Sequence, residues 1–169
     1  MMNWNIIKTQ ADADALMRTF MGFHDSCIRE AHLWTDLWVS EDSNMHLAVP
    51  TDNKLRLLFQ RQWKNPSAIE LLFEKVIRFN MVPAPDNNDP IIYDATLIAW
   101  DGEIFWADDC SCTPDNPNRD RYTWISAKKL SWHPVDWLGP QLHYGPGDVE
   151  VPDSHGCARS GHVSSIKEE

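Results

Sequence analysis

Apolar and polar residues alternate along much of the chain, most clearly in residues 91–109. Two runs rich in β-branched and aromatic residues meet there at Asp101-Gly102. Because Asp and Gly tolerate the positive φ angles of a type I′ turn, this segment predicts a β-hairpin. Both faces of the incoming run carry apolar side chains, a pattern typical of a strand in the middle of a sheet. We therefore expect the hairpin to be central.

Segments with a similar alternation predict strands on both sides of the hairpin, at residues 27–40, 45–49, 55–62, 68–80 and 122–132. The second and third of these segments predict another hairpin, bent at Asp52-Asn53. The fourth segment also fits a helix of about three turns. We predict a strand there, because Ile69, Leu71 and Phe73 alternate with glutamates and the neighbouring segments are all extended.

One helix is predicted near the N-terminus, at about residues 9–21. Thr9 or Asp12 can cap its start, and apolar residues lie four positions apart within it. Gly22 can end the helix by adopting the left-handed conformation. We expect this helix to lie across one face or one end of the sheet.

About seven strands and one helix predict an α+β fold that is mostly β. The strands are expected to form an antiparallel sheet that is curled or folded into a sandwich. A chain of 169 residues suits one domain, and we assign the globular domain to residues 1–137. Gly and Pro recur in residues 138–169, so an irregular C-terminal segment is expected.

The chain is acidic, with a formal net charge of −10 from 25 acidic and 15 basic residues. Such a surface repels phosphate backbones, so nucleic acids are not expected partners. The same charge favours fast association with a basic protein. The N-terminus lacks the features of a signal peptide, and no apolar stretch has the length of a membrane span. We therefore expect a cytoplasmic protein that does not bind membranes.

The four cysteines are expected to be reduced in the cytoplasm, and their spacing supports no disulfide framework. Three of them lie with two histidines in clusters that offer thiolate and imidazole ligands for zinc: Cys110, Cys112, His155, Cys157 and His162. Neither cluster has the Cys-x-x-Cys spacing, and the gap between them is much longer than in zinc fingers. We therefore predict no bound metal and no other cofactor.

The adjacent residues His24 and Asp25 are candidates for proton transfer, because imidazole and carboxylate are commonly combined for it. Neighbouring side chains of an extended chain point to opposite faces, which would keep these two from sharing one substrate. We favour a structural interpretation, in which Asp25 accepts backbone hydrogen bonds at a turn and His24 packs beside Phe23.

Carboxylates gather on the predicted central hairpin, at Asp94, Asp101, Glu103, Asp108 and Asp109. Paired carboxylates that face each other across a cleft can cleave glycosidic bonds. The turn explains Asp101, and strand termination explains Asp108 and Asp109. Asp94 has no such explanation, because a carboxylate in mid-strand needs polar partners if it is buried.

Two short motifs connect the chain to a known group of proteins. The run FHDSCIREAHLW follows directly on Gly22 and opens with Phe23, His24 and Asp25, and the later run IELLFEKVIRFNMV contains Phe73, Glu74 and Val76. These motifs resemble small bacterial proteins, including those of the immunity protein 50 type, some of which are assigned to neutralising a toxin. The resemblance spans about residues 23–82, and the chain differs by its added N-terminal helix and its Gly/Pro-rich tail.

Two functions follow as hypotheses, and the sequence carries no common nucleotide-binding or hydrolase motif. The first is a non-enzymatic protein-binding domain, an immunity-like inhibitor that covers a basic toxin with an acidic face. The alternative is a domain that binds or hydrolyses a carbohydrate or another small ligand with Asp94, Trp100 and Trp106. The nine tryptophans either fill a β core, which we favour, or form a sugar-binding platform. An inhibitor predicts a broad acidic surface without a deep cleft, whereas an enzyme predicts Asp94 in a concave pocket.

Overall fold

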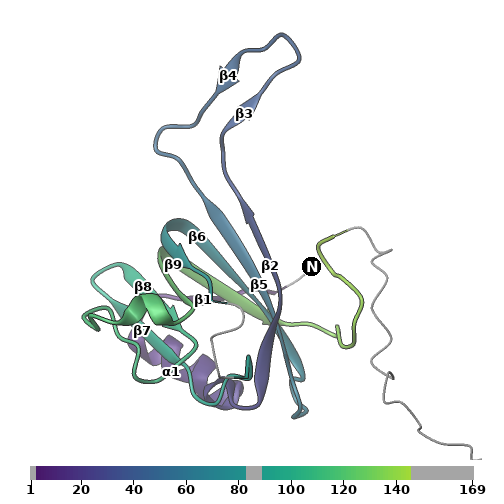
Figure 1. The fold of residues 1–169 in the computed structure, drawn as a ribbon, viewed down its shortest axis with the longest axis vertical. Coiled ribbons are helices and arrows are strands. Elements are labelled where there is room, and N and C mark those ends of the chain that lie inside the picture. The colour runs from purple at the N-terminus through teal and green to yellow at the C-terminus, as the bar shows by residue number, and fades with distance from the viewer. Residues whose placement is uncertain (1–2, 83–88, 146–169) are drawn as a thin grey trace, which may run out of the picture.

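The structure is a computed structural model that describes residues 3–82 and 89–145. The described strands are β1 (Asn5–Ile7), β2 (Ser26–Trp34), β3 (Trp38–Val39), β4 (Met45–His46), β5 (Lys54–Arg61), β6 (Ala68–Asn80), β7 (Thr96–Trp100), β8 (Glu103–Ala107) and β9 (Trp124–Pro134). The described helices are α1 (Gln10–Thr19) and the short 3-10 helices η1 (Met21–Phe23) and η2 (Arg119–Arg121). Seven strands form one antiparallel sheet in the order β2-β5-β6-β9-β8-β7, with β1 also paired to β9, and β3 pairs with β4 (Figure 1).

This architecture confirms the predicted α+β fold that is mostly β. Within the described residues the large sheet is not stacked on a second large sheet, so a single sheet, and not a sandwich, is formed. α1 lies below the sheet (Figure 1), and the core fills the space between them. Leu16 of α1 and Phe20, which directly follows the helix, meet Phe73 of β6 and Trp106 of β8 in this core, and all four are fully buried.

The predicted hairpin is confirmed as β7 and β8, with Asp101 and Gly102 at φ angles of 43° and 72°. Its predicted central position is wrong, because β7 forms one end of the sheet. The outer edge of β7 is covered by α1 instead of by another strand. The Gln10 side chain donates a hydrogen bond to the Leu97 carbonyl at 3.2 Å and accepts one from the Ala99 amide at 2.9 Å. Among the residues of β7, Leu97 alone is buried, so apolar side chains on both faces did not require a second neighbouring strand.

The prediction of a strand over residues 68–80 is confirmed, because β6 spans all 13 of them between β5 and β9. The predicted hairpin of residues 45–62 is wrong, since β4 pairs with β3 and β5 pairs with β2 and β6. The predicted strand over 27–40 is likewise divided into β2 and β3. Alternation fixes which side chains share a face of a strand, but it does not select the neighbouring strand.

The predicted helix exists but is shorter than expected, since α1 ends at Thr19. Thr9 caps it, and Asp12 completes a reciprocal capping box. Backbone and hydroxyl hydrogen bonds from Lys8 and Thr9 hold the pKa of Asp12 below its usual value. Within the described residues, no helix is long and apolar enough to cross a bilayer.

Candidate functional site

The connection between β2 and β5 forms an arm, residues 35–53, that projects away from the main sheet (Figure 1). Asp52 fixes its base, because the Asp52 carboxylate accepts a hydrogen bond from the Lys75 amide at 2.8 Å and pairs with the Lys54 ammonium at 3.0 Å. Within the arm, β3 and β4 pair, and the Trp38 and His46 rings stack with centroids 4.0 Å apart. The arm is thus an ordered ribbon with little support from the core.

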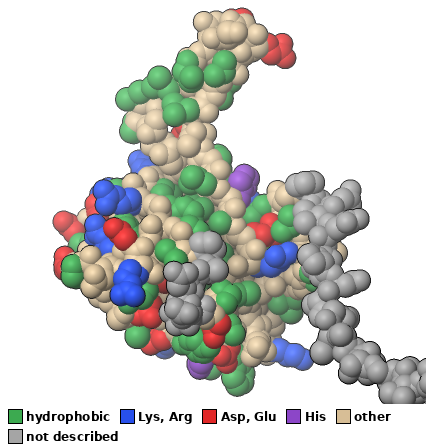
Figure 2. Space-filling view, in the orientation of Figure 1, with side chains coloured by type: hydrophobic (Ala, Val, Ile, Leu, Met, Phe, Trp, Pro, Cys, Tyr) green, Lys and Arg blue, Asp and Glu red, His purple; other side chains and the backbone are tan. Residues whose placement is uncertain are grey.

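The surface of the arm is unusually apolar for an element that projects into solvent. Its large exposed apolar side chains are Leu37, Trp38, Val39, Met45, Leu47 and Val49. Trp38 is 58% exposed and Val49 is 85% exposed. Figure 2 shows these green side chains gathered along the arm, with carboxylates at its tip. Exposed apolar patches of this kind mark interaction sites more often than isolated exposed residues do.

The charge of the arm has one sign. Its acidic residues are Asp36, Glu41, Asp42 and Asp52, and no Lys or Arg lies between Thr35 and Asn53. At the tip, the Asp42 carboxylate accepts hydrogen bonds from the Ser40 hydroxyl and the Asn44 amide, which hold the pKa of Asp42 below its usual value. The arm therefore presents apolar side chains together with ionised carboxylates at neutral pH.

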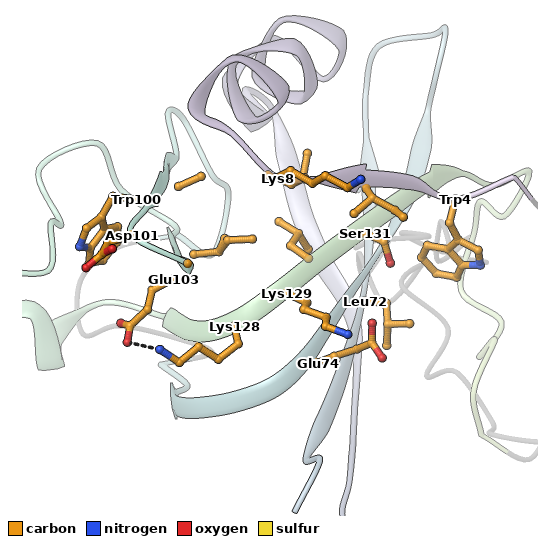
Figure 3. Close-up of a pocket in the computed structure, with 16 residues that line it drawn as sticks. Trp4, Lys8, Leu72, Glu74, Trp100, Asp101, Glu103, Lys128, Lys129 and Ser131 are labelled. Carbon is orange, nitrogen blue, oxygen red and sulfur yellow. Dashed lines mark hydrogen bonds and ion pairs between the residues drawn. The ribbon is translucent and has the colours of Figure 1, made fainter. Parts of the chain in front are cut away.

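A groove of about 660 Å³ lies between β1 and the β7–β8 hairpin (Figure 3). It exists because β1 and β8 pair with the same side of β9 but do not meet. Ile7 pairs with Leu130 and Ile104 pairs with Ala127, so the two residues between, Lys128 and Lys129, have no described partner strand on that side. We call this opening the β9 groove.

Sequence reasoning missed a buried polar cluster on the sheet face opposite α1. Glu70 of β6, whose side chain is 4% exposed, faces Arg56 Nε at 3.4 Å, His133 Nε2 at 3.8 Å and His143 Nε2 at 3.6 Å. Tyr144 also packs here, and burial with the nearby Glu70 charge raises its pKa. The alternation of residues 68–80 predicted the face of Glu70, but partners from three other segments are not visible in sequence.

Arg29 and Glu30 of β2 anchor the C-terminal segment that follows β9. The Glu30 carboxylate accepts hydrogen bonds from the backbone amides of His143 and Tyr144, the latter at 2.9 Å. The Arg29 guanidinium donates to the Pro140 carbonyl. Residues 138–145 are irregular, and residues 146–169 of the predicted irregular segment lie outside the described residues.

Replacing Glu30 with alanine is expected to loosen this segment. Hydrogen bonds to a charged group contribute roughly 1.5–3 kcal/mol each, so amide exchange at His143 and Tyr144 should accelerate at least about tenfold. Hydrogen exchange resolved by NMR measures this effect. Glu103→Ala is the control, because Glu103 pairs with Lys128 and, among the described residues, has no hydrogen bond or ion pair to the segment. Unchanged exchange in Glu30→Ala would show that the segment is held elsewhere.

The structure brings His24 and Asp25 together, contrary to the expected separation of neighbouring side chains. Asp25 adopts a φ of 55°, so the chain is not extended there, and His24 Nδ1 lies 3.4 Å from Asp25 Oδ1. The Asp25 carboxylate also accepts a hydrogen bond from Trp63 Nε1 at 3.0 Å. His24 is exposed and its ring lies 6.4 Å from that of Tyr93, so it does not pack into the core beside Phe23.

Asp94, Asp108 and Asp109 line one shallow hollow of about 290 Å³. Asp94 is exposed and lies before β7, not within a strand. Asp108 is partly buried, and burial raises its pKa although its carboxylate accepts the Thr123 amide at 3.1 Å. An Asp94 carboxylate that is exposed to solvent does not need the buried polar partners that the sequence suggested.

The two candidate tryptophans have different environments. Trp106 is 0% exposed and packs edge to face against Phe23 and Phe59, with centroids 5.6 and 5.3 Å away. Buried in this way, it cannot contact a ligand. Trp100 is 41% exposed and lines the β9 groove.

The candidate zinc ligands, at which no bound metal was predicted, are described only in part, because His155, Cys157 and His162 lie outside the described residues. Cys110 is exposed, whereas Cys112 is buried against Phe105 and Trp124. Within residues 3–82 and 89–145, no group of three His, Cys, Asp or Glu side chains is placed to hold a metal ion.

The two cysteines are expected to react differently with alkylating reagents. Burial, reinforced by the charges of Asp108 and Asp109, raises the pKa of Cys112 to about 11. Because the thiolate is the reactive species, iodoacetamide at about pH 8 should modify Cys110 in the folded protein and Cys112 only in urea. Peptide mass spectrometry measures both sites. Equal labelling without urea would contradict the burial of Cys112.

Comparison with protein-family models, curated proteins and solved structures finds no significant match for this chain. The resemblance to immunity proteins of the immunity protein 50 type therefore stays a prediction.

Proposed function

We propose that this protein is a non-enzymatic, cytoplasmic binding domain that docks its arm onto a basic protein, as an immunity-like inhibitor does with its toxin. The observation that carries the proposal is the projection of large apolar side chains on an element that buries none of them in its own core. Protein interfaces gain most of their affinity from a few large side chains that become buried on binding. Trp38, the largest side chain of the arm, is the expected anchor.

Charge supports a partner of the opposite sign and not a second copy of the chain. The arm carries four carboxylates and no Lys or Arg, and the whole chain has a net charge of −10. Two copies would bring like charges together at the arm, which opposes self-association. A basic partner would bring cations to the carboxylates around Trp38, Leu47 and Val49, and its association should slow as salt screens the attraction.

Capture from the native host tests this proposal. The full chain and an arm variant, Trp38→Ser with Leu47→Ser and Val49→Ser, are crosslinked in parallel lysates, and retained proteins are quantified by mass spectrometry. The expected result is one basic protein retained in a one-to-one ratio by the unmodified chain and lost with the variant. The control is Ile77→Ser, which removes an exposed apolar side chain of β6 and should retain the partner.

Three outcomes would contradict the proposal. Retention of the same protein by the arm variant would place the interface elsewhere. A retained partner that is acidic would contradict the expected attraction between the acidic arm and a basic protein. Self-association of the unmodified chain, abolished by the arm variant, would make the arm a contact between copies.

A further inference from the structure

We propose that the β9 groove binds a small molecule with an apolar body and one carboxylate head. This site is separate from the arm and goes beyond the proposed protein binding. A volume of about 660 Å³ lies within the range of about 300–1,000 Å³ that is usual for ligand pockets. The groove crosses the gap in the pairing of β9, so its floor reaches the side chains of the core.

The floor of the groove is apolar and is formed by side chains of the buried core. Ile7, Ile104 and Leu130 line it and also belong to the buried core. Ala99 adds a small side chain beside them, which leaves room above the floor. An aliphatic or aromatic body lying here would remove apolar surface from water at roughly 25 cal/mol per Å².

The charges of the groove are unevenly divided along its length. Figure 3 shows Lys8 and Lys129 on opposite sides of the opening near Ser131, with Glu74 as the acidic residue at this end. The charged groups at this end are therefore two ammonium groups, those of Lys8 and Lys129, and one carboxylate, that of Glu74. Among the described residues, neither Lys8 nor Lys129 has a carboxylate oxygen within 4.0 Å of its ammonium nitrogen. This end therefore favours the negative head of a ligand.

The other end has the opposite balance. Lys128 Nζ lies 2.6 Å from Glu103 Oε1, so these two charges neutralise each other. The Asp101 carboxylate then leaves this end, beside Trp100, with an excess of one negative charge. A second anionic group here would be repelled, whereas an apolar chain can lie against the exposed Trp100 ring. The ligand is thus oriented, with its carboxylate between Lys8 and Lys129 and its body directed toward Trp100.

Calorimetric titration of the full chain with dodecanoate, below its micellar concentration, tests this inference. The expected result is saturable binding of one dodecanoate per chain, with a blue shift of tryptophan fluorescence that is reduced in Trp100→Phe. Dodecylamine, which has the same chain and a positive head, is expected to bind at least about tenfold more weakly, the effect of a 1.4 kcal/mol difference.

Two variants test separately how the carboxylate head and the apolar body of the ligand contribute to its affinity. Lys8→Gln with Lys129→Gln should weaken dodecanoate at least about tenfold and leave dodecanol unaffected, because both side chains are exposed and only the charge changes. Ala99→Phe should exclude dodecanoate and dodecanol alike. Lys64→Gln, an exposed lysine outside the groove, is the matched control and should change neither.

Several results would overturn the inference. They are the absence of saturable dodecanoate binding, equal affinity for dodecylamine, or an unchanged affinity in the double lysine variant. Should Ala99→Phe fail to fold, as shown by circular dichroism, the lysine variants and the head-group comparison still decide the question.

Discussion

Replacement of Trp106 with alanine is expected to lower the free energy of unfolding by about 3–5 kcal/mol, the range for large aromatic residues removed from a core. Trp106 is fully buried and contacts Phe23 and Phe59 through edge-to-face packing. Its loss would leave a cavity where η1, β5 and β8 meet. Urea denaturation followed by circular dichroism measures the change, with a lower midpoint and an unchanged slope as the expected result.

Two matched variants locate the source of this effect. Trp100→Ala removes the same side chain from an exposed position, and its effect on unfolding is expected to lie within about 0.5 kcal/mol. Trp106→Phe keeps an aromatic ring and removes the indole N–H, which is buried and has no hydrogen-bond partner among the described residues, so it should cost much less than alanine. Equal destabilisation by Trp100→Ala and Trp106→Ala would contradict the placement of the two residues.

Replacement of Trp38 with alanine is expected to weaken binding of the captured basic partner at least about 30-fold, the equivalent of a 2 kcal/mol loss at an interface hot spot. Trp38 is exposed and, among the described residues, stacks only on His46 of the neighbouring strand, so the stability of the fold should not change. Titration calorimetry with the purified partner measures the affinity, and thermal unfolding checks the fold.

Trp63→Ala is the control for this experiment. Trp63 is 49% exposed, similar to Trp38, but it lies after β5 and donates its indole N–H to Asp25. Its replacement should leave the affinity for the partner unchanged. An equal loss of affinity in the two variants would mean that exposed tryptophans in general, and not the arm, bind the partner.

Local signals in the sequence predicted the individual elements well. The Asp101-Gly102 turn formed as expected, since both residues adopt positive φ angles. Thr9 caps α1, and the alternation of Ile69, Leu71 and Phe73 gave both the strand and its buried face. Each of these features depends on residues close together in the chain, where propensity and periodicity act directly.

Pairing between distant segments could not be predicted. β5 pairs with β2 across the arm, and β9 pairs with β6, β8 and β1 at once. The free edge of β7 is covered by the side chain of Gln10, which is 87 residues from Leu97. Alternation contains no information on such distant partners, so the hairpin of residues 45–62 was placed wrongly.

The candidate sites show the same division between local and distant information. The arm carries a signal that could have been used, because Leu37-Trp38-Val39 and the apolar residues of 45–49 lie in a segment without Lys or Arg. The β9 groove and the contacts of Glu70 with His133 and His143 arise only from strand order and from the return of the C-terminal segment.

The central claim, that the arm is the binding surface, is tested most directly by hydrogen–deuterium exchange of the full chain with and without the captured partner. In the free chain the amides of the arm should exchange rapidly, because residues 41–51 are all exposed. On binding, we expect strong protection across residues 37–49 and little change in β6 and β9. Protection at the β9 groove or elsewhere on the main sheet, with the arm still exchanging rapidly, would contradict the account.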